Sequence, residues 1–332
     1  MQSARRRTSH ALARTRRRRA VAVGVVVAFA VAVTAALHSG LGGAPRPAIA
    51  STVVKPPPIA PVMPDPTSAI RWSNPEPWAG TPAPLLVASF PADRSGDRAY
   101  VAWIRASRTE LALYPGYQGP GPSALWRGPE MVPVSARSTL LSTFNSGFYE
   151  AAGPAGFYVN GRLYDPMVRG LATVVQYTNG TVDVAPWTGS ARPGPNIVVA
   201  RQNLGLLVNN GRATPAAAGS YVWGTTLGGV AAIWRSALGV DRNGNLIYAA
   251  APNQTAPSLA RIMVHAGAVR AMELDINPAW PMLATFGRPN AGAPSLFVQN
   301  PNQGATRFLS PSQKDFFAIY LRATPDVRSV PF

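Results

Sequence analysis

The chain contains no cysteine. Disulfide bonds, thiolate metal sites and cysteine nucleophiles are therefore excluded. Stability must come from a hydrophobic core. With 47% apolar residues in a chain of 332, the sequence is long and apolar enough to bury one.

Histidine is scarce, with only His10, His38 and His265 in the whole chain. A zinc site built from several imidazoles is therefore excluded. A Ser-His-Asp triad would have to use His265, which falls inside a predicted helix and off its apolar stripe. A solvated helix face is the better interpretation of that residue. Acid–base chemistry in this chain therefore falls to carboxylates.

Acidic residues and lysines are also few. The chain has 14 acidic and 31 basic residues, and Lys55 and Lys314 are the only lysines. Nine basic residues precede Ser51, which leaves a net charge of about +8 for the rest of the chain. The arginines are scattered singly instead of forming a basic patch interleaved with aromatics, which argues against a nucleic-acid partner. Abundant Arg, Ala and Pro indicate a GC-rich, bacterial coding bias.

The N-terminus has the pattern of a membrane anchor. Residues 1–19 hold eight arginines and no acid, and residues 20–37 are an apolar run with Thr34 as its one polar residue. Such a run is long enough to cross a membrane as a helix. The arginines place residues 1–19 in the cytoplasm and the following chain on the outer side. The alternative is a signal peptide cleaved after AIA at 48–50, but the length of the run favours a retained anchor.

Residues 38–84 are predicted to be a linker, because twelve prolines occur between positions 44 and 84 and such segments favour extended geometry. We interpret it as a spacer that lifts a domain off the membrane. Residues 85–332 form that domain, where short β-runs replace the prolines.

The domain is predicted to be α+β, with a mostly antiparallel or mixed β-sheet and few helices. Asn-Gly pairs begin at positions 160, 179, 210 and 243, and this dipeptide is the strongest short-range signal for a hairpin. Apolar residues at helical spacing predict one helix over Pro257–Ala266. The run Phe316–Leu321 predicts a buried last strand.

Glu273 and Asp275 end a predicted strand. Because they are two residues apart, both side chains are expected on one side of the sheet. Two carboxylates on one face raise the pKa of one of them, which suits a general acid beside an ionised partner. Glycosidases use such a pair. Alternatively, one carboxylate only accepts hydrogen bonds and fixes the strand end, and Mg²⁺ or Ca²⁺ binding by these oxygens stays open.

Three stretches together resemble the phosphodiester glycosidase family. Residues 145–149, NSGFY, match the family pattern Asn-Gly-Gly-Phe-Phe. Residues 235–239, RSALG, match Arg-Thr-Ala-Ile-Gly and precede a hairpin as in the family. Residues 273–275, ELD, match Asn-Leu-Asp and follow a helix. The resemblance spans about 133–322. It implies an extracytoplasmic glycosidase without a redox cofactor, which cleaves a sugar-phosphodiester or glycosidic linkage in cell-envelope glycan.

The resemblance also implies roles for single residues. Asp275 is the expected general acid or nucleophile, with Glu273 as its partner. Arg235 would hold an anionic leaving group through a bidentate contact, and Asn145 would bind sugar hydroxyls or a water. The remaining candidates for substrate binding are Gly147, Tyr149 and Asp241. Asp241 stands beside a turn, where capping is the more common role. Tyr149 and Trp280 are candidates for stacking on a sugar, and Glu150 is a reserve carboxylate.

One departure from the family pattern concerns the residues after Asp275. Three glycines are usual there, whereas this chain has Ile276, Asn277 and Pro278. Glycine loops offer backbone N–H groups to phosphate, and Pro278 has no N–H. The chain would then recognise its substrate differently, act on a linkage without phosphate, or have lost catalysis. The rival interpretation is a non-catalytic glycan-binding or envelope-scaffold protein on the same fold.

Overall fold

The computed structural model describes residues 53–63, 70–120, 128–149, 156–218, 223 and 231–322. The predicted cytoplasmic tail 1–19 and membrane segment 20–37 lie outside these residues. Within the described part, no helix has the length and apolar character needed to cross a membrane.

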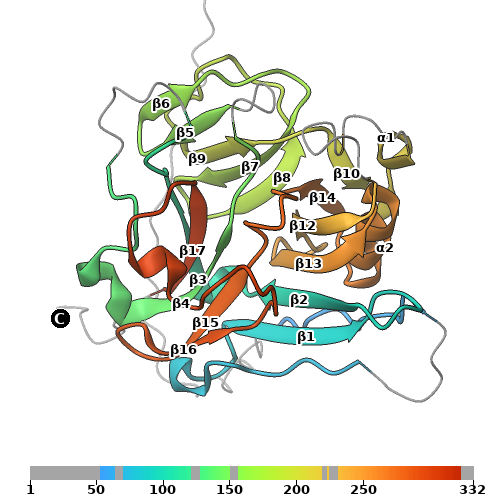
Figure 1. The fold of residues 1–332 in the computed structure, drawn as a ribbon. Helices are drawn as coiled ribbons and strands as arrows, with labels where there is room; N and C mark the ends of the chain where they lie inside the picture. Colours follow the sequence, from blue (N-terminus) through green and yellow to red (C-terminus); the bar gives the residue numbers. More distant parts are fainter. Residues whose placement is uncertain are drawn as a thin grey trace, which may run out of the picture. The chain divides into compact units, whose positions relative to one another are not determined.

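Three antiparallel sheets form the domain (Figure 1). The seven-stranded sheet has the order β1 (Leu85–Pro91), β2 (Arg98–Ile104), β13 (Leu246–Gln254), β12 (Ile233–Val240), β14 (Arg270–Glu273), β10 (Leu206–Asn209) and β11 (Arg212–Ala213). A five-stranded sheet has the order β16 (Gly292–Leu296), β15 (Leu283–Arg288), β4 (Leu140–Asn145), β17 (Phe316–Leu321) and β3 (Thr109–Tyr114). The other has the order β6 (Arg162–Asp165), β5 (Phe157–Val159), β9 (Ile197–Gln202), β7 (Ala172–Tyr177) and β8 (Val182–Pro186).

Among the residues that the structure describes, helical segments are few and short. They are α1 (Pro215–Ala218), α2 (Ala256–His265) and the 3₁₀ turns η1 (Pro77–Ala79), η2 (Ala106–Arg108), η3 (Val134–Thr139) and η7 (Arg307–Leu309). The predicted α+β class with mainly antiparallel sheet is therefore confirmed.

The three sheets share one hydrophobic core. Its buried residues include Ile104 from the seven-stranded sheet, Phe144 and Phe317 from one five-stranded sheet, and Phe157 and Val174 from the other. A second apolar cluster lies between α2 and the other face of the seven-stranded sheet. The seven-stranded sheet is therefore covered on both faces, which explains its many fully buried alanines.

All four Asn-Gly pairs fall in turns between paired strands, as predicted. They join β5 to β6, β7 to β8, β10 to β11 and β12 to β13. At Asn160-Gly161 and Asn210-Gly211 both residues have positive φ, which is the conformation that a two-residue type I′ hairpin requires. The local signal was sufficient because each turn is formed by residues that are adjacent in the sequence.

The predicted helix and last strand are also confirmed. Helix α2 begins one residue before the prediction, and Thr255 caps it: the Thr255 hydroxyl accepts from the backbone of Ser258 at 3.2 Å, and the Ser258 hydroxyl accepts from the backbone of Thr255 at 2.8 Å. His265 is half-buried, with Nδ1 3.0 Å from the carbonyl oxygen of Ala60. Strand β17 covers the predicted range, and its pairing with both β4 and β3 buries it within the sheet.

The segment predicted as a spacer differs from the prediction, because its described residues pack on the domain, beginning with the buried Ile59. Ser73 pairs with Val87 of β1 through two backbone hydrogen bonds of 2.8 and 2.9 Å. The indole of Trp78 donates to the carbonyl of Phe286 at 2.8 Å, and Glu76 is fully buried. The proline count alone did not indicate that aromatic and polar residues between those prolines, such as Trp78 and Glu76, contact the domain. The domain therefore begins before Leu85.

We expect a chain that starts at Leu85 to be less stable than one that starts at Thr52. It loses the burial of Trp72 and Trp78 and the hydrogen bonds to β1 and β15, which together stabilise the fold by on the order of 5 kcal/mol. Urea denaturation measures the difference. In the longer chain, Trp78→Phe removes only the indole hydrogen bond and should cost about 1 kcal/mol. Equal unfolding midpoints for the two chain lengths would show that residues 52–84 are a spacer after all.

Candidate active site

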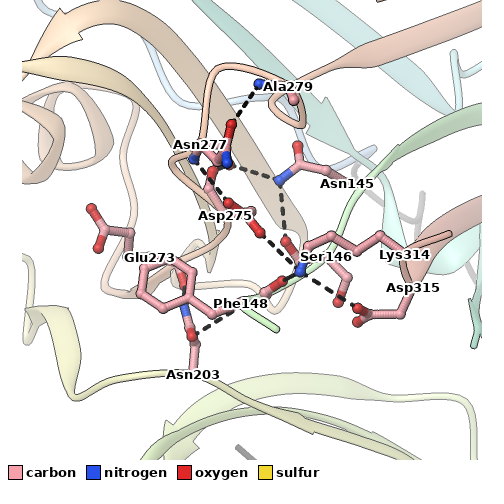
Figure 2. A network of polar contacts seen from close by, with 12 residues as sticks. Asn145, Ser146, Phe148, Asn203, Glu273, Asp275, Asn277, Ala279, Lys314 and Asp315 are labelled. Carbon is pink, nitrogen blue, oxygen red and sulfur yellow. Dashed lines mark hydrogen bonds and ion pairs between the residues drawn. The ribbon is translucent and has the colours of Figure 1, made fainter. Parts of the chain in front are cut away.

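The site lies where strands from two sheets end together. Asn145 ends β4 and pairs with Phe316 at the start of β17. Glu273 ends β14 and pairs with Ala237 of β12. The segment after β14 is tied to the segment after β4, because the backbone N–H of Asp275 donates to the carbonyl of Ser146 at 3.0 Å. Figure 2 shows the polar contacts that these strand ends bring together.

Lys314 is the centre of these contacts. Its Nζ lies 2.8 Å from Oδ2 of Asp275 and 3.8 Å from Oδ1 of Asp315, and it donates to the carbonyl of Gly147. Nζ also lies 4.3 Å from the ring centre of Tyr149, a cation–π geometry. The Lys314 side chain is 1% exposed, so its charge is balanced by protein groups instead of water. The lysine therefore fixes Asp275 in place.

Asp315 is held by a second buried cation. Nε of Arg201 lies 2.8 Å from Oδ2 of Asp315, and the guanidinium also donates to the carbonyls of Phe148 and Gln202, both at 2.6 Å. Burial opposes the ionisation of Asp315, but Arg201 and Lys314 outweigh it and lower the pKa of Asp315 below its ordinary value. Asp315 is therefore a buried anion that balances the charges of Arg201 and Lys314.

Gly147 is the glycine that this packing requires. A Cβ at that position would lie 3.2 Å from the guanidinium carbon of Arg201 and 3.3 Å from the carbonyl oxygen of Gln202. Any side chain would therefore press on the buried arginine. The sequence suggested substrate binding for Gly147. In the structure, the absence of a side chain at Gly147 also leaves room for the guanidinium of Arg201.

Glu273 and Arg235 form a separate buried pair. Nη1 of Arg235 lies 2.6 Å from Oε1 of Glu273. The same guanidinium donates to the carbonyls of Gln254, Trp223 and Ala231 at 2.7, 2.7 and 3.0 Å. Oε2 of Glu273 is buried and has no hydrogen-bond partner in the described part of the chain. Burial raises the pKa of Glu273 to about 8, against the opposing effect of Arg235.

The expectation that Glu273 and Asp275 point to one side is therefore corrected. Asp275 contacts Lys314 and Glu273 contacts Arg235, and Figure 2 shows the two carboxylates directed to different sides. Strand β14 ends at Glu273, so the alternation of a strand no longer governs Asp275. Arg235, expected to hold an anionic leaving group, is 2% exposed and committed to Glu273 and three carbonyls.

Asn145 is a structural residue in this arrangement. Its amide donates to the hydroxyl of Ser236 at 2.9 Å and to the carbonyl of Ser146 at 3.2 Å. Its oxygen accepts from the hydroxyl of Tyr248 at 2.8 Å and from the backbone of Met282 at 3.1 Å. Both donors and both lone pairs are used. The predicted contact of Asn145 with sugar hydroxyls is therefore replaced by a role in joining β4, β12 and β13.

Asp241 caps its turn, as the alternative interpretation held. Oδ1 accepts from the backbone N–H groups of Asn243 and Asn245 at 2.8 and 3.0 Å, and Oδ2 accepts from the indole of Trp103 at 2.9 Å. With 2% exposure, Asp241 holds the β12–β13 hairpin to β2. It leaves no free group for a substrate.

Two aromatic residues lie close to the Lys314–Asp275 pair. The rings of Tyr149 and Trp280 meet edge to face with centroids 5.7 Å apart, so the two residues suggested for sugar stacking are brought together. Burial, with the added effect of Asp275 and Asp315, raises the pKa of Tyr149 to about 12. Its phenol is therefore neutral near pH 7. The reserve candidate Glu150 lies outside the described residues.

Sequence reasoning missed Lys314, Asp315 and Arg201. The available signals were weak: Lys314 is one of two lysines, and Arg201 is a charged residue inside an otherwise apolar strand run. Charged residues in buried positions need partners, but the sequence does not name them. Within the described ranges, no group of three or more His, Cys, Asp or Glu residues is placed to hold a metal ion.

The raised pKa of Glu273 gives a prediction about stability. In the folded protein Glu273 should hold its proton from about 4.5, the ordinary value, to about 8. The folded state then binds more protons than the unfolded state, so the free energy of unfolding falls as pH rises through this window. Glu273→Gln lacks this titration. We expect the stability of the wild type relative to Glu273→Gln to decrease between pH 5 and pH 8 in urea denaturation. A relative stability that rises with pH would show an ionised Glu273.

Comparisons with known proteins identify a family over part of the domain. Residues 139–275 match the family model described as phosphodiester glycosidase, whereas no curated protein sequence matches the chain. Among solved structures, the catalytic domain of zebrafish N-acetylglucosamine-1-phosphodiester alpha-N-acetylglucosaminidase, auto-inhibited by its pro-peptide, is similar at 16% identity and a TM-score of 0.46, over 76% of this chain and 88% of that one. A hypothetical protein from Synechocystis is similar at 15% identity and a TM-score of 0.39, over 72% of this chain and 62% of that one.

The structural likeness is low, and the assignment depends on the family model. The matched residues include Asn145, Arg235, Glu273 and Asp275, and end at Asp275; Lys314 and Asp315 lie beyond them. Residues 139–275 of this chain therefore belong to a phosphodiester glycosidase domain.

Proposed function

We propose that the domain is an extracytoplasmic glycosidase that hydrolyses a sugar-phosphodiester or glycosidic linkage in cell-envelope glycan. The proposal rests on the position and the contacts of Asp275. Asp275 ends the family-matched segment, retains 6% side-chain exposure, and is paired with the buried Lys314 beside Tyr149. A carboxylate fixed in this way is positioned to act on a bound sugar. The location is proposed from the basic tail and the apolar run 20–37.

Asp275 has the contacts of a nucleophile or base. Oδ2 interacts with Lys314 at 2.8 Å, and Oδ1 accepts from the backbone N–H of Asn277 at 2.9 Å. Each oxygen keeps a free lone pair. One of the two carboxylate oxygens can attack the anomeric carbon while the bond to the leaving oxygen breaks. Alternatively, it can remove a proton from an attacking water. The leaving group takes both electrons of the broken bond.

The position of Glu273 favours a substrate with a good leaving group. A general acid must reach the leaving oxygen, and Glu273 is fully buried against Arg235. A phosphate ester is a weak base and departs with little protonation, whereas a sugar alkoxide needs a proton from an acid. A sugar phosphodiester therefore fits this site better than an ordinary glycosidic linkage.

The burial of Glu273 also favours the second candidate, a non-catalytic glycan-binding or scaffold protein. Glycosidases place two carboxylates on either side of the scissile bond, and Glu273 and Asp275 do not form that arrangement here. A protein that only binds glycan would keep the aromatic pair Tyr149 and Trp280 and would not need Asp275 to react.

Asp275→Asn tests the two candidates. We expect kcat on sugar-1-phosphodiesters to fall at least about 100-fold, because loss of a positioned acid–base group or nucleophile costs this much or more. Glu110→Gln removes an exposed carboxylate on β3 and should leave kcat unchanged. Hydrolysis of a panel of aryl glycosides and sugar-1-phosphodiesters gives the comparison. Unchanged turnover in Asp275→Asn would remove Asp275 from catalysis, and no turnover by the folded wild type would support the glycan-binding candidate.

A further inference from the structure

Arg307 is a half-buried cation without an acidic partner in the described part of the chain. Its guanidinium carbon lies 4.6 Å from the ring centre of Trp280 and 5.9 Å from that of Phe308. Nη1 donates to Oε1 of Gln303 at 3.0 Å. No carboxylate among the described residues lies within 4.0 Å of Arg307. By contrast, the buried cations of the site, Arg201, Arg235 and Lys314, each have one.

Arg307 lies at the aromatic side of the site. Trp280, on which it stacks, is also the edge-to-face partner of Tyr149, and Tyr149 covers Lys314. The phenols of Tyr149 and Tyr117 act to raise the pKa of Arg307, and Arg307 acts to lower the pKa of Tyr149. Burial lowers the pKa of Arg307 from its ordinary value, although an arginine stays charged at neutral pH. Its charge is therefore partly removed from water and available to an anion.

The loop that replaces the family's glycines positions Arg307. Residues 276–280 form a compact turn after Asp275, in which Trp280 donates its backbone N–H to the carbonyl of Asn277 at 2.8 Å. Asn300 donates to the carbonyl of Pro278 at 2.9 Å, and Gln303 donates to the carbonyl of Ala279. Because Gln303 also accepts from Arg307, the altered loop and the arginine belong to one connected unit.

We propose that Arg307, stacked on Trp280, binds an anionic phosphate group of the substrate beside Asp275. This inference depends on the proposed function. It assigns to Arg307 the anion binding that was expected of Arg235 and of a glycine loop. Arg235 is committed to Glu273, and a loop containing Pro278 cannot offer the N–H groups of a glycine loop. A guanidinium held over an aromatic ring presents its remaining N–H groups in the fork geometry that phosphate oxygens accept.

Phosphate binding by the full chain tests the inference directly. Inorganic phosphate is titrated calorimetrically into the wild type, Arg307→Gln and the control Arg288→Gln, which removes an exposed arginine on β15. We expect the wild type and the control to bind phosphate alike, and Arg307→Gln to bind at least 10-fold more weakly. Equal binding by wild type and Arg307→Gln, or no binding by the wild type, would overturn the inference.

Kinetics separate this inference from the proposed function. In Arg307→Gln we expect KM for a sugar-1-phosphodiester to rise at least 10-fold, while kcat/KM for a neutral aryl glycoside changes less than 2-fold. A KM for the phosphodiester that does not change would overturn the anion site and leave the glycosidase intact. Phosphate binding that depends on Arg307, in a folded chain without any turnover, would support the anion site and contradict the glycosidase.

Discussion

The arrangement of the site depends on one buried ammonium group. Nζ of Lys314 contacts Asp275 after β14, the carbonyl of Gly147 after β4, and Asp315 before β17. An unpaired charge in this position would cost several kcal/mol. The three segments must therefore bring their oxygens to the lysine, and Tyr149 adds its ring face. The burial of one charge thus fixes the geometry of the whole strand-end region.

The acidic and basic side chains of this region pair in two separate groups. Asp275 and Asp315 contact Lys314 and Arg201, and Glu273 contacts Arg235. Because Glu273 keeps its proton up to about pH 8, its contact with Arg235 is a hydrogen bond from the guanidinium. Arg307 stands outside both groups and has no acid among the described residues. In the function that we propose, Arg307 is the cation that meets the anionic group of the substrate.

The division of the carboxylates affects the chemistry that the domain can perform. A glycosidase that cleaves a sugar–sugar bond needs a proton at the leaving oxygen. Glu273 is buried against Arg235 and is not placed to supply that proton, whereas a phosphate leaving group needs little assistance. The function that we propose accommodates both the departure of the 276–278 loop from the family pattern and the burial of Glu273, because in it phosphate is bound by a side chain and leaves without strong acid catalysis.

Features that depend on neighbouring residues could be predicted from the sequence. The Asn-Gly hairpins, helix α2 and strand β17 lie where their local patterns placed them, and the motifs around Asn145, Arg235 and Asp275 lie within the residues that match the family. Contacts between distant residues could not be predicted. Lys314 and Gly147 are 167 residues apart, and nothing in the sequence around Lys314 names its partners. The opposite directions of Glu273 and Asp275 depend on the residue at which β14 ends, where sequence patterns are least informative.

The most direct test of this account is a double-mutant cycle on the free energy of unfolding, with Asp275→Asn and Lys314→Met made singly and together. If the buried ion pair organises the site, either substitution lowers the free energy of unfolding less when the other is already present. The coupling energy is then at least about 1.5 kcal/mol. Additive effects, within about 0.5 kcal/mol, would show that the two residues act independently and would contradict the central role given to Lys314.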